Sequence, residues 1–107
     1  MPVYQCLAPA QFTTPDNRDT IAAEFTRIHA TVTGAPPEFV NVIFVDLPDG
    51  RTYTAGKPLC RSLITGFIRS GRDEQTRARL LTQLSEAWSQ ITGQPTEQLV
   101  LGLIDVE

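Results

Sequence analysis

The sequence repeats itself at an interval of 59 residues, and this duplication restricts the possible folds more than any other feature. The hexapeptide TGAPPE at 33–38 precedes an apolar run over 39–46, and TGQPTE at 92–97 precedes a second run over 98–105. Thr, Gly, Pro and Glu match in register, and so does the Asp that closes each run. Five matches in order indicate two copies of one structural unit.

Each copy has the pattern of a strand, a helix and a second strand. β-rich runs at 2–7 and 62–68 predict the first strand of each copy. The first helix is predicted to begin at Thr14-Pro15-Asp16 and the second at Asp73, and each carries apolar residues every three or four positions. Gly34 and Gly93 are predicted to end the helices. Such a crossover makes the two strands of a copy parallel.

The predicted fold is therefore a single α/β (α+β) domain over 1–107, built as a tandem β-α-β repeat with pseudo-two-fold symmetry. The halves span 2–46 and 61–105, and we expect a hairpin between them, with a short strand over 51–54 and a turn over 56–58. The first and third strands would pair antiparallel at the centre of a four-stranded sheet.

Both helices must then cover the same face of the sheet, because the chain has no third layer. The second and fourth strands nevertheless read as near-continuous apolar runs, a pattern typical of burial on both faces. We therefore expect a closed homo-oligomer with its sheets facing inward.

Composition and charge exclude several classes of function. The formal net charge of -3 argues against binding to nucleic acid, and no apolar run reaches the roughly 18 residues of a membrane span. The start of the chain lacks the pattern of a signal peptide, and two distant cysteines, Cys6 and Cys60, suggest reduced thiols in a cytoplasmic protein. With one histidine and no nucleotide-binding motif, we expect neither a metal nor a cofactor.

Pro2 is the main candidate for a catalytic group. Methionine is normally removed before a small residue, which would leave Pro2 with a free secondary amine. The pKa of a free α-amine is roughly 7.7–8.0, and burial or nearby cations lower that pKa. A neutral amine can accept a proton from carbon or oxygen. Proline is also a common second residue without any such role.

Two arginines, Arg69 and Arg72, lie between the third strand and the second helix. Such a pair can bind a carboxylate or phosphate, although solvated loop arginines are commoner. Pseudo-two-fold symmetry would place the start of the first strand near the end of the third, and thus Pro2 near both arginines. His29 borders the apolar stripe of the first helix, so it is either a packing residue or a group that holds a substrate oxygen.

Together, Pro2-Val3-Tyr4, His29 followed by Thr33-Gly34, and Arg69-x-x-Arg72 resemble the tautomerase superfamily, most closely the group of cis-3-chloroacrylic acid dehalogenase. The resemblance covers nearly the whole chain. It implies a homotrimer of β-α-β-β-α-β subunits with the amino-terminal proline, here Pro2, in each active site. It also implies that His29, Arg69 and Arg72 bind the carboxylate of a small substrate.

The sequence departs from the dehalogenases at two places. They carry a tyrosine on the last strand where Gly102 stands here, and a water-activating glutamate in an extension for which neither Asp105 nor Glu107 is an evident replacement. We therefore expect a cofactor-independent tautomerase of small 2-oxo acids or their enols, such as phenylpyruvate or a 2-hydroxydienoate. The alternatives are a cis-3-haloacrylate dehalogenase or hydratase of low activity, or, if Met1 is retained, a non-catalytic trimeric binding protein.

Overall fold

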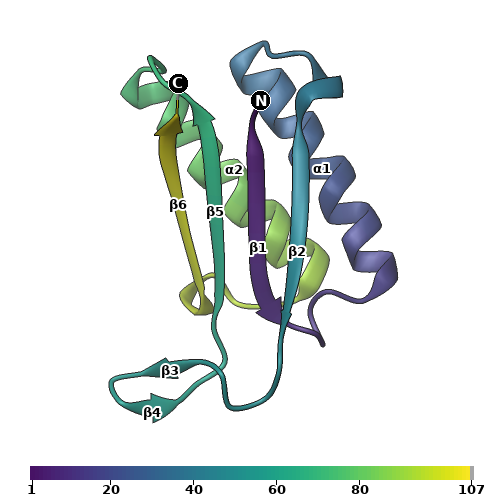
Figure 1. Ribbon diagram of the computed structural model, residues 1–107, viewed down its shortest axis with the longest axis vertical. Helices are drawn as coiled ribbons and strands as arrows, with labels where there is room; N and C mark the ends of the chain where they lie inside the picture. The colour runs from purple at the N-terminus through teal and green to yellow at the C-terminus, as the bar shows by residue number, and fades with distance from the viewer. Residues whose placement is uncertain (107) are drawn as a thin grey trace.

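The computed structural model describes residues 1–106 as a four-stranded sheet with two helices on one face (Figure 1). The first half contains β1 (Val3–Pro9), α1 (Pro15–Thr33) and β2 (Asn41–Leu47), and the second contains β5 (Ser62–Arg69), α2 (Glu74–Thr92) and β6 (Leu99–Val106). A hairpin of β3 (Tyr53–Thr54) and β4 (Lys57–Pro58) connects them. The predicted tandem β-α-β repeat is confirmed.

The sheet has the strand order β2-β1-β5-β6. Each outer strand runs parallel to its inner neighbour, and the two inner strands are antiparallel, with Val3 opposite Phe67 and Leu7 opposite Leu63. The predicted central pairing is therefore correct. As a result, the beginning of β1 lies beside the end of β5, as the ribbon in Figure 1 shows.

Both helices are capped by the residues that the sequence indicated. The Thr14 hydroxyl accepts a hydrogen bond from the Asn17 backbone N–H at 3.3 Å, and the Asp73 carboxylate accepts one from the Thr76 N–H at 2.8 Å. Each helix ends at a glycine in the left-handed region, where φ is 77° for Gly34 and 78° for Gly93. The buried faces of the helices pack on the inner strands through Ile21, Phe25, Ile28, Leu80, Leu84, Ala87 and Trp88.

The connections into the outer strands differ from the prediction. Short 3₁₀ turns, η1 (Pro37–Phe39) and η2 (Thr96–Gln98), take up residues assigned to the strands, so β2 begins at Asn41 and β6 at Leu99. In the hairpin, the turn predicted over 56–58 lies instead at Ala55 and Gly56, which have φ values of 52° and 76°. Two successive residues with positive φ make the tight turn, and the next two are free to pair as β4.

The face of the sheet opposite the helices carries apolar side chains that no other element within residues 1–106 covers. The exposed fractions are 51% for Ile43, 41% for Val45, 41% for Leu63, 55% for Val100 and 49% for Ile104. Leu63 pairs in register with Val100 on β6 and with Leu7 on β1, and Leu7 pairs in turn with Val45 on β2. The exposed apolar side chains are therefore neighbours across the strands, and we call this surface the open sheet face. Neither helix in residues 1–106 has an apolar stretch that could span a membrane.

Candidate active site

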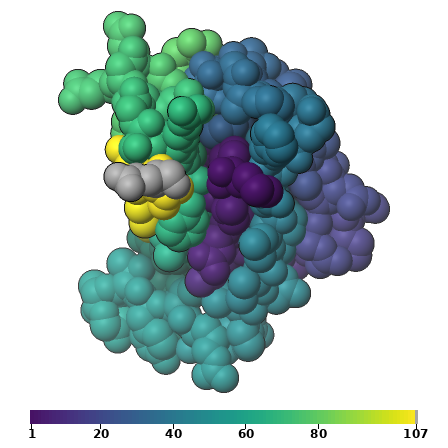
Figure 2. Space-filling model, turned by 45° about the horizontal axis from the view of Figure 1, so that its top comes forward, coloured from purple at the N-terminus to yellow at the C-terminus, as the bar shows by residue number. Residues whose placement is uncertain are grey.

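A cavity of about 500 Å³ lies at the end of the sheet where β1 begins. Three segments far apart in sequence form its walls: the amino terminus, the end of α1 with η1, and the loop after β5 (Figure 2). The lining residues are Met1, Pro2, Thr33, Gly34, Ala35, Pro36, Phe39, Arg69 and Arg72. The cavity thus brings together three of the four site residues predicted from the sequence, namely Pro2, Arg69 and Arg72.

Pro2 is buried and firmly held at the start of β1. The Pro2 carbonyl oxygen accepts a hydrogen bond from the Asn41 backbone N–H at 2.9 Å and another from the Asn41 side-chain amide at 3.5 Å. The same amide donates to the Phe39 carbonyl at 3.0 Å, which ties Pro2 to the opposite wall of the cavity. Met1 precedes Pro2 in the described chain, so the Pro2 nitrogen there is an amide and becomes basic only when Met1 is removed.

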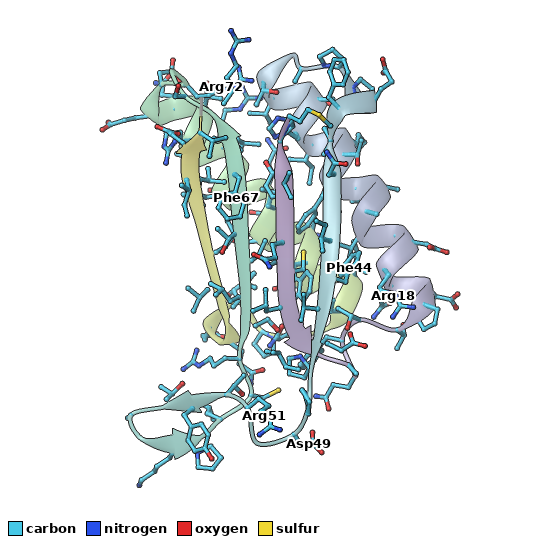
Figure 3. The ribbon with its side chains drawn as sticks, in the orientation of Figure 1. Arg18, Phe44, Asp49, Arg51, Phe67 and Arg72 are labelled. Atoms are coloured by element: carbon cyan, nitrogen blue, oxygen red, sulfur yellow. The ribbon has the colours of Figure 1, made fainter. Side chains whose placement is uncertain are left out.

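The two arginines reach the cavity from the end of β5 and from the loop that leads into α2. Arg69 is the exposed last residue of β5, and Arg72 precedes the cap of α2 (Figure 3). The Ser70 backbone N–H donates to the Val106 carbonyl at 2.9 Å and fastens this loop to β6. Arg72 Nε is buried and has no hydrogen-bond partner among residues 1–106. A buried charged donor without an acceptor is costly, so this atom is suited to an anionic ligand.

His29 is not among the residues that line the cavity. Its side chain is 1% exposed on α1, and its Nδ1 lies 2.7 Å from the Tyr4 hydroxyl oxygen. Burial, and to a smaller extent the Arg72 charge, lowers the pKa of His29 to about 4. His29 is therefore neutral at pH 7. It also lies close enough to Arg72 for the guanidinium charge to disfavour protonation of the imidazole.

The pseudo-symmetric end of the second repeat lacks this chemistry. The position equivalent to His29 is Trp88, whose Nε1–H donates at 2.8 Å to the side-chain Oε1 of the buried Gln94. The Ser62 hydroxyl donates to the same Oε1 at 2.8 Å. The positions 59 residues before Arg69 and Arg72 hold Ala10 and Thr13. Duplication therefore reproduced the fold but left the arginine pair at one end only.

The remaining candidate that the structure describes, Asp105, lies outside the cavity. Asp105 is paired with Arg77, and Glu107 lies outside the described residues. Within residues 1–106, no three His, Cys, Asp or Glu side chains gather where they could hold a metal ion. From the sequence, Tyr4 and Phe39 were possible lining residues without a supporting signal, and Ala35 and Pro36 were not considered. The repeated TGxPxE motif was the available signal for the wall over 33–39, because it marks the same turn in both copies.

Comparison with known families identifies a match over most of the chain. The sequence model of the family described as "Putative oxalocrotonate tautomerase enzyme" matches residues 1–97. A search among curated proteins finds no match to the sequence.

Three solved structures illustrate the similarity. Native Ps01740 is 31% identical, with a TM-score of 0.93, and the alignment covers 97% of this chain and 93% of that chain. N1, a member of the cis-3-chloroacrylic acid dehalogenase family, is 27% identical, with a TM-score of 0.92 and coverage of 97% and 74%. A fused 4-OT described as a symmetric trimer is 19% identical, with a TM-score of 0.89 and coverage of 97% and 85%, and it supports the fold alone.

Proposed function

The chain belongs to this oxalocrotonate tautomerase-type family of the tautomerase superfamily, and from that premise we propose that it is a cofactor-independent tautomerase of small 2-oxo acids. The observation that carries the proposal is that Pro2 and two guanidinium groups, Arg69 and Arg72, line one and the same cavity. A base and a cationic anchor at one site are what enolisation next to a carboxylate requires.

In this mechanism, Met1 is removed and the Pro2 nitrogen acts as the base. The positive charges of Arg69 and Arg72 favour its neutral form, because a nearby cation lowers the pKa of an amine. The nitrogen takes the proton from the enol oxygen and returns a proton to the carbon next to the oxygen-bearing carbon. The product is the ketone. One group performs both transfers, so no second acid–base residue is needed.

The arginines bind the substrate carboxylate and stabilise the negative oxygen of the enolate. A guanidinium group donates in a planar fork that matches a carboxylate, and the free Arg72 Nε supplies one such donor. His29 would orient the carboxylate or the neighbouring oxygen through Nε2, because Nδ1 is engaged with Tyr4.

The opposite wall of the cavity indicates the kind of substrate. Ala35, Pro36 and Phe39 present apolar surface, and the volume of about 500 Å³ lies within the range of small-molecule sites. We therefore propose a monocarboxylate with an apolar substituent, such as phenylpyruvate, in preference to a dicarboxylate.

A Phe39→Ala variant tests this substrate class. We expect it to raise the KM for phenylpyruvate about tenfold, because the aromatic ring of the substrate loses contact worth roughly 1–2 kcal/mol. Pyruvate enol, which has no aromatic ring, should be affected much less. Steady-state kinetics with both substrates measures the difference, and an equal effect on the two would contradict the assignment of Phe39.

We also propose that the protein is a homotrimer whose subunits bury the open sheet face against one another. This surface is apolar and continuous, as expected of a subunit interface. A Leu63→Asp variant should weaken assembly by at least about 100-fold, since it buries an unpaired carboxylate. Light scattering should report trimers for the wild type and for a control Ala23→Asp on the exposed side of α1. A monomeric wild type, or a Leu63→Asp variant that assembles normally, would contradict the interface.

Dehalogenation of 3-haloacrylates is the second candidate, favoured by the similarity to the dehalogenase-family member N1. Hydrolytic dehalogenation needs a base that activates water, and Asp105, held by Arg77, is poorly placed for that role. A paired assay of enol-to-keto conversion and halide release separates the functions. The tautomerase predicts ketonisation without halide, whereas halide release at a comparable rate would favour the dehalogenase. Binding of 2-oxo acids with neither reaction would indicate a non-catalytic protein.

A further inference from the structure

We infer that Tyr4 is a positioning residue that holds His29 as a neutral imidazole with its proton on Nε2. This inference deepens the proposed function and rests on it for its catalytic consequence. The hydrogen-bond geometry itself is independent of any reaction. In the proposed mechanism, His29 would then offer the substrate an uncharged hydrogen-bond donor close to Arg72, the cation that acts on the ring.

The direction of the hydrogen bond follows from burial. The Tyr4 side chain is fully buried, and His29 Nδ1, 2.7 Å away, is the only acceptor that its hydroxyl bonds among residues 1–106. If Nδ1 carried the proton instead, it would donate to the Tyr4 oxygen, and the buried hydroxyl proton would have no acceptor. The favourable arrangement has the Tyr4 O–H donating to Nδ1, which leaves the proton of the neutral ring on Nε2.

The fold fixes the position of the Tyr4 ring. Tyr4 pairs with Gly66 on β5, and a Cβ on Gly66 would lie 2.6 Å from Tyr4 Cε1. The tyrosine ring therefore occupies the space that a side chain at position 66 would otherwise fill. Edge-to-face contacts with Phe25 at 5.7 Å and with His29 at 5.6 Å between ring centroids hold it from the side of α1.

The electrostatics of the pair agree with the neutral assignment. The titratable groups that act on the imidazole are Tyr4 from β1 and Arg72 from the loop before α2. Burial raises the pKa of Tyr4 well above its usual range, so the hydroxyl keeps its proton. Burial disfavours a charged imidazolium, the nearby Arg72 cation disfavours it further, and the pKa of His29 falls to about 4 accordingly.

The single histidine of the chain makes a direct test possible. In uniformly ¹⁵N-labelled protein, two-bond ¹H–¹⁵N correlation spectra report the protonation of both ring nitrogens of His29 alone. For the wild type we expect a protonated Nε2, an unprotonated Nδ1 and no titration between pH 8 and pH 5. A proton on Nδ1, or an imidazolium at pH 7, would overturn the inference whether or not any variant folds.

Two substitutions and a matched control extend the test to function. Tyr4→Phe removes the hydroxyl, and Gly66→Ala keeps the hydroxyl but displaces the ring. Both should yield a mixture of the two tautomers and lower kcat/KM about tenfold, as expected for one lost hydrogen bond. Tyr53→Phe removes the hydroxyl of the other tyrosine, which is exposed on β3, and should change neither the spectrum nor the rate.

The outcomes separate this inference from the proposed function. The expected spectra without tautomerase activity would leave the assignment of Tyr4 intact and refute the proposed function. Tautomerase activity together with an unchanged tautomer in Tyr4→Phe would support the function and refute the positioning role.

Discussion

A Pro2→Gln variant will lose tautomerase activity by about 10²–10⁴-fold, the range typical of a removed general base. Glutamine is too large for the preceding methionine to be removed, so the nitrogen at position 2 stays an amide and cannot act as the base. A Pro2→Ala variant permits removal of Met1 and exposes a primary amine at the same place. Its loss should be smaller, because an amine remains while the rigidity of the proline ring is gone.

The measurement is enol-to-keto conversion of phenylpyruvate enol, with the first residue of each variant checked by mass spectrometry. Folding of each variant is compared by circular dichroism, since Pro2 also bonds to Asn41 through its carbonyl. The graded order, wild type above Pro2→Ala above Pro2→Gln, is what the amine mechanism requires. Equal rates for all three proteins would remove Pro2 from the chemistry.

An Arg72→Ala variant should lower kcat/KM by roughly 30-fold to several thousand-fold. The estimate corresponds to 2–5 kcal/mol for truncating one partner of a desolvated, hydrogen-bonded charge pair. Arg72 has a buried Nε without a hydrogen-bond partner in the described chain, so this donor is free to bind an anionic substrate without first breaking another hydrogen bond. Arg72→Lys keeps the charge but not the planar fork, and should recover only part of the loss.

Arg79→Ala is the matched control, because Arg79 is an exposed arginine on α2 away from the cavity. The loss in Arg72→Ala should be larger for carboxylate substrates than for the corresponding methyl esters, which lack the negative charge. A similar loss for acids and esters would mean that Arg72 supports the structure and does not bind the carboxylate.

Much of the fold could be predicted because the signals were local. Thr14, Asp73, Gly34 and Gly93 act within one helical turn, and the duplication let each half check the other. The central antiparallel pairing followed from symmetry. The 3₁₀ turns were missed because they depend on how the chain packs after each helix, and Pro36 and Pro95 fit an extended segment equally well.

The site was only partly accessible to the same reasoning. Symmetry placed Pro2 beside Arg69 and Arg72, and the cavity they share agrees with that expectation. The environment of His29 could not be read from its helix alone. The His29 ring packs against Tyr4, and the Tyr4 ring fits only because Gly66 has no side chain. These three residues come from α1, β1 and β5, so no local pattern in the sequence connects them.

The most direct test of the account is covalent labelling of the amino-terminal nitrogen with 2-oxo-3-pentynoate. This 2-oxo acid has an alkyne conjugated with its ketone, so a neutral amine can add to it and form a stable nitrogen–carbon bond. Intact mass and peptide mapping should show a chain that begins at Pro2 and carries one adduct on that residue, formed more slowly when phenylpyruvate competes. A chain that retains Met1, or a label found elsewhere, for example on Cys60, would contradict the central role of Pro2.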